Sequence, residues 1–427
     1  MKASDAKSSS HAQPELTLPY LVGLDGLRAL AVAAVLLYHA EFDLRGGFLG
    51  VESFFVISGY LITALLLAEW QQGNSVDILA FWLRRARRIL PALFLTIAAT
   101  VVLAVVLLPP EEIESLPGDA LAAIGFVMNW RLIASQQSYF DPLVRPLLLK
   151  HVWSLAVEEQ FYLIWPLLLA LGMRVLHRRG MLLATLLAAA ASTALMALLF
   201  TPDADPARVY YGTDTRASGL LIGAALAFWL PGHTLAANRQ FVGRLLDLAG
   251  VMAIATLIAS FALLDEFNPL LYQGGFTLVA IITAVVIVAV AHPLAVIVPR
   301  TLGWPPLVWI GLRSYGIYLW HWPVFMVTRP YQDVQLDGLP LLALRLTIVL
   351  MLTELTYRYV EQPVRRGALQ HAWRAMRRGA RGVKRGVRRA SPLKSHLSSH
   401  TPHFTLRKSL TLSWSERWPC HSFASKV

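Results

Sequence analysis

The feature that most constrains this chain is a series of long blocks with almost no charged residues, such as Leu93–Leu108, Leu182–Phe200 and Val279–Ala291. Apolar blocks approaching or exceeding about 18 residues are typical of membrane-spanning helices. The composition agrees, with 56% hydrophobic and only 15% charged residues, against about 45–50% and about 25% in soluble domains. The sequence therefore predicts an all-α, polytopic transmembrane helix bundle and argues against a large soluble enzyme.

About ten spans are expected, together with a short apolar segment at 119–134 that we interpret as interfacial or re-entrant. Lys and Arg favour the cytoplasmic side of a membrane. If 119–134 does not cross, the basic loops fall on one side and the acidic loops on the other, so both termini are expected in the cytoplasm and the chain in the inner (plasma) membrane. The expected spans are 20–40, 48–69, 89–108, 152–173, 181–200, 216–231, 245–264, 270–291, 307–328 and 339–360.

The net charge of +12 belongs to one end of the chain. Residues 364–427 carry 15 Lys and Arg and one acid, a net charge of +14, which leaves −2 for the rest. The predicted organisation is a cytoplasmic tail at 1–19, a transmembrane domain at 20–363 and a basic, disordered cytoplasmic tail at 364–427. We expect this tail to meet anionic lipid rather than nucleic acid. Nothing at the N-terminus resembles a cleavable signal. The single cysteine, Cys420, leaves the body without thiolate chemistry or disulfides, and no metal site is expected.

The first predicted span carries three ionisable residues. Asp25 and Arg28 are three positions apart on one helix face. His39 follows eleven residues after Arg28, about 16 Å further along the axis and on the same face. Charged groups inside a membrane are costly, so they are candidates for function. An interfacial Asp25–Arg28 pair with His39 as a helix-end residue is the structural alternative.

The fourth predicted span opens with His151 and Ser154 and then places two adjacent carboxylates, Glu158 and Glu159, about 10–12 Å into the membrane. Packing does not explain two neighbouring carboxylates at that depth. Glu52, near the outer end of the second span, and His321, in the ninth span, are further candidates. Taken singly, Glu52 could be a solvated residue at the membrane rim, and His321 could be a structural histidine.

Arg85 and Arg88 precede the third span and share one helix face. Arginines at such a position serve as topology anchors, but guanidinium groups also bind phosphate bidentately. The sequence thus gathers arginines toward the cytoplasmic side and histidines with glutamates in the outer half. This separation suits a donor held by its phosphates from inside and a base that meets an acceptor from outside.

At these residues the sequence resembles the acyltransferase-3 family of integral membrane acyltransferases. The resemblance implies transfer of an acyl group, most often acetyl, from cytoplasmic acyl-CoA to a hydroxyl of an extracytoplasmic glycan or glycolipid, such as lipopolysaccharide O-antigen, exopolysaccharide or peptidoglycan. It implies that His39 is the catalytic histidine, that Arg85 and Arg88 serve the donor, and that Arg28 serves the active site. The matching stretches are 25–39, 46–63, 81–91, 151–162, 214–216, 315–323 and 358–363.

Two departures from the family pattern stand out. Glu52 occupies a position where Asp is common. No further span or soluble SGNH-hydrolase domain follows Arg366, so transfer is expected to finish within the membrane body or to use a separate periplasmic partner. No permanently bound cofactor is expected, because acyl-CoA is a substrate.

The expected mechanism is a single displacement in which His39 takes the proton of the acceptor hydroxyl. Glu159, or Glu158, would orient His39 as the buried carboxylate does in a catalytic triad. A covalent intermediate on His39, Ser154 or Ser58 is an alternative. Asp25, Glu52, His151, Ser154 and His321 are expected to support the site. The rival function is a transporter or flippase for an anionic or glycosylated solute, whose path the same charged residues would line.

Overall fold

The computed structural model describes residues 20–136, 146–202, 204–230 and 239–366. By its internal contacts the chain divides into two units, Met1–Glu361 and Gln362–Val427. Of the second unit, only Gln362–Arg366 is described, with Gln362–Arg365 forming α15. The predicted tails at 1–19 and 364–427 lie outside the described residues, apart from the first three positions of the latter, and their boundaries and disorder stay predictions.

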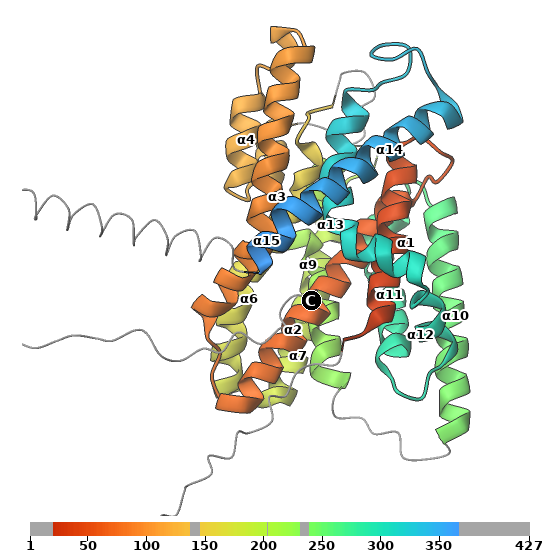
Figure 1. Ribbon diagram of the computed structural model, residues 1–427. Coiled ribbons are helices and arrows are strands. Elements are labelled where there is room, and N and C mark those ends of the chain that lie inside the picture. Colours follow the sequence, from red (N-terminus) through yellow and green to blue (C-terminus); the bar gives the residue numbers. More distant parts are fainter. Residues whose placement is uncertain (1–19, 137–145, 203, 231–238, 367–427) are drawn as a thin grey trace, which may run out of the picture. The chain divides into compact units, whose positions relative to one another are not determined.

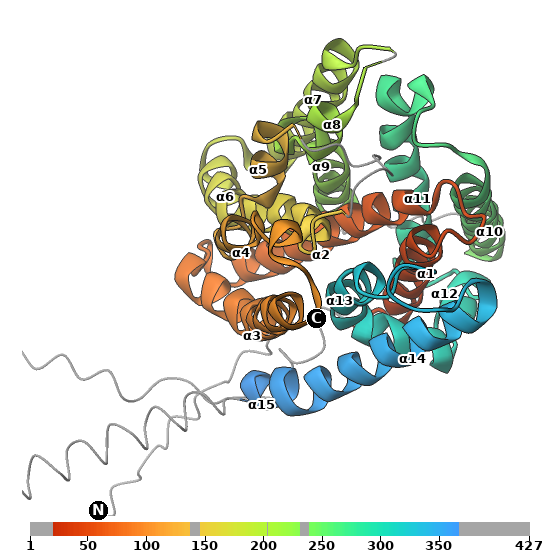
Figure 2. The ribbon, with the colours of Figure 1, turned by 90° about the horizontal axis from the view of Figure 1, so that it is seen from above.

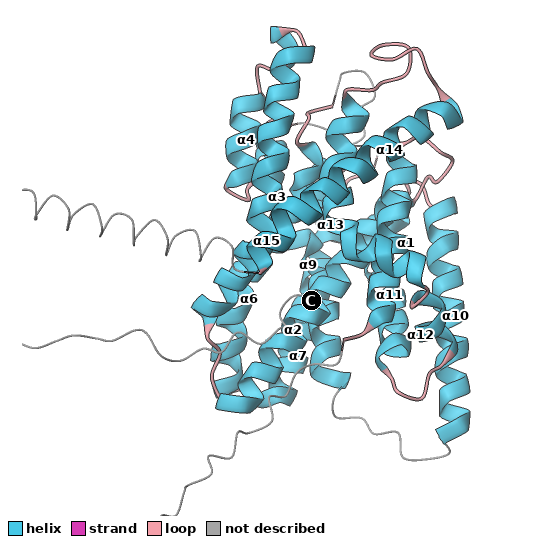
Figure 3. Ribbon diagram, viewed as in Figure 1, coloured by secondary structure: helices cyan, strands magenta, loops and turns pink. Residues whose placement is uncertain are grey.

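Ten long helices overlap the ten predicted spans, so the all-α bundle is confirmed (Figures 1 and 3). The third helix begins at Ile78 rather than at 89, so it includes the arginines that were expected to precede it. The described residues form no strand beyond one isolated bridge between Pro330 and Val334. The ten helices are α1 (Val22–His39), α2 (Gly50–Gly73), α3 (Ile78–Leu107), α6 (Trp153–Val175), α7 (His177–Leu199), α9 (Thr213–Trp229), α10 (Arg239–Leu263), α11 (Phe276–Ala291), α13 (Pro305–Met326) and α14 (Gly338–Thr356).

Shorter helical turns connect these helices. They are η1 (Gly47–Leu49), η2 (Pro110–Glu112), α4 (Leu116–Ile124), α5 (Met128–Ala134), η3 (Lys150–Val152), α8 (Ala207–Tyr211), η5 (Leu271–Gly275), α12 (Ile297–Leu302) and η6 (Tyr357–Glu361).

Eight described helices are long and apolar enough to cross a membrane. The other two predicted spans correspond to α9 and α13. Helix α9 has 17 residues, most of them buried, and α13 carries Arg313, His321 and several aromatic residues that lower its hydropathy. Both helices lie among other helices, where lipid contact is not required, so the protein is a multi-pass membrane protein with two interior helices of mixed polarity.

The segment predicted not to cross forms two short helices rather than one. Helices α4 and α5 have nine and seven residues, which corresponds to about 14 and 10 Å. Neither length reaches across a hydrocarbon core of about 30 Å. Phe126, with φ of 54°, separates them. The Gln160 side chain of α6 donates to the Phe126 carbonyl (2.8 Å) and to Asn129 (3.0 Å), which holds the pair against α6.

Small residues allow the interior helices to approach closely. The most extensive contacts join α2 with α9, α7 with α9, and α1 with α13. A Cβ atom on Gly59 of α2 would lie 1.9 Å from the carbonyl oxygen of Leu220, and one on Gly223 of α9 would lie 2.0 Å from that of Val56. Small residues at crossing points are how membrane helices pack without a hydrophobic driving force.

Helix α13 is the element that brings the candidate site together. Seen along the bundle, it lies between α1, α3 and α14 (Figure 2). Its residues Tyr318 and His321 therefore reach the C-terminal end of α1 on one side and η3 with the start of α6 on another.

Candidate active site

The three predicted histidines meet at one place. The Nδ1 atom of His39 lies 3.0 Å from the Nε2 atom of His321, and the two rings stack with centroids 5.2 Å apart. The ring of His151 meets His321 edge to face at 5.7 Å. His151 and His321 are fully buried and His39 is half-buried. Residues from three distant parts of the chain thus form one imidazole cluster, which lies inside protein and not against lipid.

Hydrogen bonds determine which nitrogen of each ring carries a proton. The Nδ1 atom of His321 lies 2.6 Å from the backbone carbonyl of Tyr318. A carbonyl only accepts, so Nδ1 of His321 is the donor. In the neutral His321 ring, Nε2 is then an acceptor, and Nδ1 of His39 must donate to it. In a neutral His39 ring, the remaining nitrogen, Nε2, then carries no proton, which is the state that a general base requires.

Tyr318 connects this cluster to a cavity. Its hydroxyl donates to the backbone carbonyl of His151 at 2.8 Å and lies 2.6 Å from the Ser154 hydroxyl. Because the single phenolic proton is used toward His151, Ser154 is the donor in the second bond. Ser154 and Tyr318 both line the cavity.

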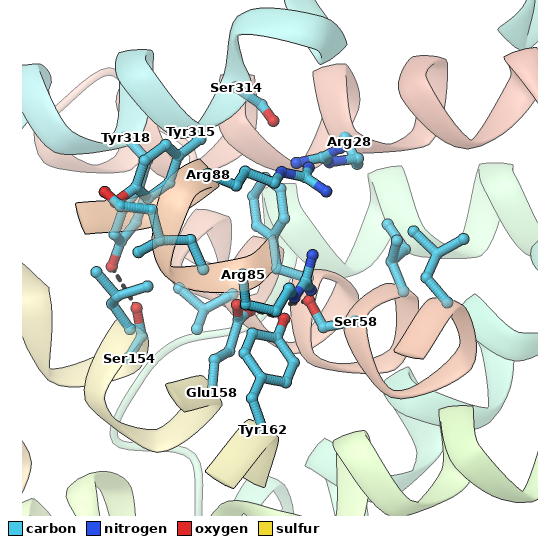
Figure 4. Close-up of a pocket in the computed structure, with 16 residues that line it drawn as sticks. Arg28, Ser58, Arg85, Arg88, Ser154, Glu158, Tyr162, Ser314, Tyr315 and Tyr318 are labelled. Carbon is cyan, nitrogen blue, oxygen red and sulfur yellow. Dashed lines mark hydrogen bonds between the residues drawn. The ribbon is translucent and has the colours of Figure 1, made fainter. Parts of the chain in front are cut away.

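The cavity has a volume of about 90 Å³ and is lined by three arginines, Arg28, Arg85 and Arg88 (Figure 4). In Figure 4 the side chains of Arg28 and Arg88 extend toward each other. The other polar residues of its wall are Ser58, Ser154, Glu158, Tyr162, Ser314, Tyr315 and Tyr318.

The four arginines of the predicted run lie within α3, and the two faces of this helix have different surroundings. Arg85 stacks on the Tyr162 ring, with 4.4 Å from its guanidinium carbon to the ring centroid, and like Arg88 it is half-buried. Arg84 and Arg87 are exposed, and Arg84 pairs with Glu69 at 3.2 Å. The predicted pair is therefore the one that faces the cavity.

Arg28 and Asp25 form the predicted i,i+3 pair, with 3.8 Å between Nη1 and Oδ1. Tyr20 also donates a hydrogen bond to Asp25. Asp25 is buried, and Arg28 is held at the cavity wall. Asp25 thus balances the charge of Arg28 and orients its side chain.

The position that we expected a carboxylate to occupy beside His39 is occupied by His321. Glu158 instead accepts hydrogen bonds from Ser58 (3.2 Å) and Tyr162 (3.1 Å) in the cavity wall. The Oε1 atom of Glu159 is buried and has no hydrogen-bond partner among the described residues. The expected contact between His39 and Glu158 is therefore corrected. Glu158 lies one helical turn after Ser154 in α6, on the side of the helix that faces the arginines and not His39.

Glu52 belongs to a separate buried ion pair with Arg216. Their side chains are 1% exposed and lie 2.8 Å apart. The guanidinium of Arg216 also packs over the Phe276 ring at 4.0 Å. This pair joins α2 to α9, and its position among aromatic rings is that of a structural contact.

The sequence analysis did not single out Tyr318 and Tyr162, which line the cavity, or Arg216, which pairs with Glu52. Arg216 lies within a predicted span, so the cost of an intramembrane charge was a usable signal. The two tyrosines gave none, because tyrosine is ordinary in membrane helices. Among the described residues, no group of three His, Cys, Asp or Glu side chains is arranged to hold a metal ion.

These features define a class of protein: a multi-pass membrane helix bundle with a histidine cluster near an arginine-lined cavity. The acyltransferase-3 family model, described as an acyltransferase domain, matches residues 21–353. The chain belongs to this family.

Three relatives illustrate the similarity. The Bacillus subtilis protein YrhL is 43% identical over 81% of this chain, the Listeria monocytogenes peptidoglycan O-acetyltransferase OatA is 41% identical over 81%, and the Staphylococcus aureus O-acetyltransferase OatA is 36% identical over 85%. The aligned region covers 55%, 56% and 60% of these relatives, so the chain spans little more than half their length. No solved structure matches.

Proposed function

We propose that this protein is an O-acetyltransferase that moves an acetyl group from cytoplasmic acetyl-CoA to a hydroxyl of a cell-envelope glycan. The observation that carries the proposal is that Tyr318 links the two parts of the site: its side chain lines the arginine-lined cavity, and its backbone carbonyl accepts a hydrogen bond from His321, which contacts His39. The family membership and the names of the OatA relatives support acetyl transfer and a glycan acceptor.

The positive-inside rule supports the orientation. The end of the bundle where α3 begins carries Arg84, Arg85, Arg87 and Arg88, so we assign that end to the cytoplasm. His39, at the opposite end of α1 from Asp25, then lies toward the outer face. Both termini are proposed to be cytoplasmic, in the inner (plasma) membrane.

The arginines are proposed to hold the phosphates of the donor. Guanidinium groups bind phosphate oxygens bidentately and stay charged when half-buried. A cavity of about 90 Å³ is smaller than the roughly 300–1,000 Å³ of typical ligand pockets. We therefore propose that the nucleotide stays at the cytoplasmic mouth, and that the cavity widens along its length to admit the acyl-pantetheine arm.

His39 is proposed to act as the general base through Nε2. It takes the proton of the acceptor hydroxyl as that oxygen attacks the thioester carbonyl; the carbon–oxygen bond forms and the carbon–sulfur bond breaks. The proton then passes from His39 to the departing thiolate, so coenzyme A leaves as the thiol. General-base assistance of this kind contributes about 10²–10⁴-fold. His321 fixes the tautomer of His39, as the third member of a triad does.

The test uses the purified full chain in vesicles with the α3 start facing out, supplied with labelled acetyl-CoA outside and a peptidoglycan fragment inside. Wild type should form an alkali-labile acetyl ester, and His39→Ala should reduce kcat at least about 10²-fold. Arg85→Ala and Arg88→Ala should raise the KM for acetyl-CoA about tenfold or more, because each removes one phosphate contact.

The matched control is Arg87→Ala, on the exposed face of the same helix, which should change the KM for acetyl-CoA less than twofold. Equal effects of the Arg85 and Arg87 variants would reject the donor site. Movement of a solute across the membrane by a wild type that forms no ester would instead favour the transporter alternative.

A further inference from the structure

A second cavity lies directly beyond the C-terminal end of α1. It is formed by the loop that follows His39 and by the start of α14, which occupy the same end of the bundle (Figure 1). Its volume of about 410 Å³ is in the range of ligand pockets. Its wall includes Ala40, the residue next to His39 in the chain. Consecutive Cα atoms are 3.8 Å apart, so the wall of this cavity adjoins the backbone of His39.

A buried arginine forms part of the wall. Arg345 is 7% exposed, and it donates from Nε to the Thr328 hydroxyl (3.1 Å) and from Nη2 to the backbone carbonyls of Phe325 and Thr328 (3.3 and 2.9 Å). Its Nη1 atom has no hydrogen bond to any described residue, and no carboxylate forms an ion pair with it. Nη1 is not among the buried polar atoms that lack a hydrogen-bond partner, and Arg345 lines the cavity, so this donor is open to a ligand there.

Three carboxylates, those of Glu41, Asp43 and Asp337, line the same cavity. Two of them accept no hydrogen bond from a described residue. Glu41 and Asp43 are exposed and make no side-chain hydrogen bond within the described chain. Asp337 accepts one bond from Tyr331 (2.5 Å). With Arg345, the four groups sum to a formal charge of −2. Phe42, 37% exposed, adds an apolar surface.

We propose that this cavity binds an uncharged sugar residue of the acceptor glycan, an inference that rests on the proposed function. Carboxylates accept hydrogen bonds from sugar hydroxyls, the free Nη1 of Arg345 donates to a ring or hydroxyl oxygen, and Phe42 covers the apolar face of the ring. Because the cavity is net negative, a sugar that carries a carboxylate is repelled. The cavity therefore selects neutral sugars and presents a hydroxyl to Nε2 of His39.

The test measures binding separately from acetylation. The full chain in detergent is titrated by calorimetry with a neutral oligosaccharide, the tetramer of β-1,4-linked N-acetylglucosamine, and with a tetramer of galacturonic acid. The neutral tetramer should bind at least tenfold more tightly. Glu41→Gln/Asp43→Asn should weaken its binding tenfold or more and reduce the preference over the acidic tetramer.

Arg345→Lys provides a second variant, because it keeps the charge but loses the planar donor fork; it should weaken the neutral tetramer at least fivefold while the melting temperature stays within a few degrees. The control is Glu114→Gln, an exposed acid outside the cavity, which should leave affinity unchanged. No binding by wild type, unchanged affinity in the carboxylate variants, or equal binding of both tetramers would overturn the inference.

Comparing these binding measurements with the ester-formation assay described above separates this inference from the proposed function. Ester formation by a protein whose carboxylate variants bind normally would reject the sugar cavity alone. Sugar binding that the carboxylate variants lose, in a protein that forms no ester, would reject the acetyltransferase alone.

Discussion

The Nδ1 atom of His39 lies 3.0 Å from the Nε2 atom of His321, although 282 positions separate the two residues. His321 in turn is oriented by the backbone carbonyl of Tyr318. A backbone group fixed by the geometry of α13 therefore sets the tautomer of both rings. In the proposed mechanism, this second imidazole takes the orienting role that a carboxylate commonly has in a catalytic triad.

The first prediction concerns His321 as a positioning residue. His321→Ala should lower kcat about 10²-fold, because His39 is no longer held as the Nδ1–H tautomer. His321→Gln should recover part of this loss, since its amide oxygen can accept the same bond. The measurement is kcat against pH with saturating acetyl-CoA, and the half-buried His292 outside the cluster provides the control variant His292→Ala. An activity of His321→Ala within threefold of wild type would remove His321 from the mechanism.

The second prediction concerns the buried pair of Glu52 and Arg216. Arg216→Met should destabilise the fold by about 3–5 kcal/mol, because it leaves the Glu52 carboxylate buried without a partner. The double variant Glu52→Gln/Arg216→Met should recover much of that loss. Chemical unfolding in detergent measures both, with the more exposed pair Arg329–Asp333 as a comparison whose loss costs about 0–1 kcal/mol. A double variant no more stable than Arg216→Met would argue against charge burial as the cause.

The third prediction concerns the close approach of α2 and α9. Gly59→Ala should destabilise by about 1–3 kcal/mol or more, because the new methyl group would meet the Leu220 carbonyl, which is backbone and cannot rotate away. Gly73→Ala at the end of the same helix meets nothing nearer than 3.5 Å and should be neutral or slightly stabilising. Thermal unfolding compares the two, and similar melting temperatures would mean that the helices can separate at little cost.

The fourth prediction concerns Glu266, in the connection between α10 and η5 outside the spans. Burial, with a smaller contribution from Asp265, raises the pKa of the Glu266 carboxyl. The folded state then holds this proton more tightly than the unfolded state, so stability falls as pH rises from the unfolded pKa through the folded one. Glu266→Gln should raise the melting temperature at pH 7 and should have little effect near pH 4. A melting-temperature difference independent of pH would contradict this reading.

The order and approximate limits of the ten long helices were determined by the sequence alone. Each apolar block is local, and a helix is the form in which a single segment satisfies its own backbone inside lipid. The same local reasoning identified the three histidines, because ionisable residues at membrane depth are costly wherever they occur. Arg85 and Arg88 were identified by their i,i+3 spacing, which places two guanidinium groups on one helix face. The shortness of 119–134 also indicated correctly that it does not cross as one helix.

Tertiary structure alone decided which of these residues meet. Depth along a span places His39, His151 and His321 at one level, but their contact depends on how α1, α6 and α13 turn toward each other. The same rotation directs Glu158 to Ser58 and Tyr162 instead of His39 and pairs Glu52 with Arg216. It also places Arg345 in the wall of the second cavity. Helix rotation is set by packing between segments far apart in the chain, at contacts such as those of Gly59 and Gly223, and no local pattern encodes it.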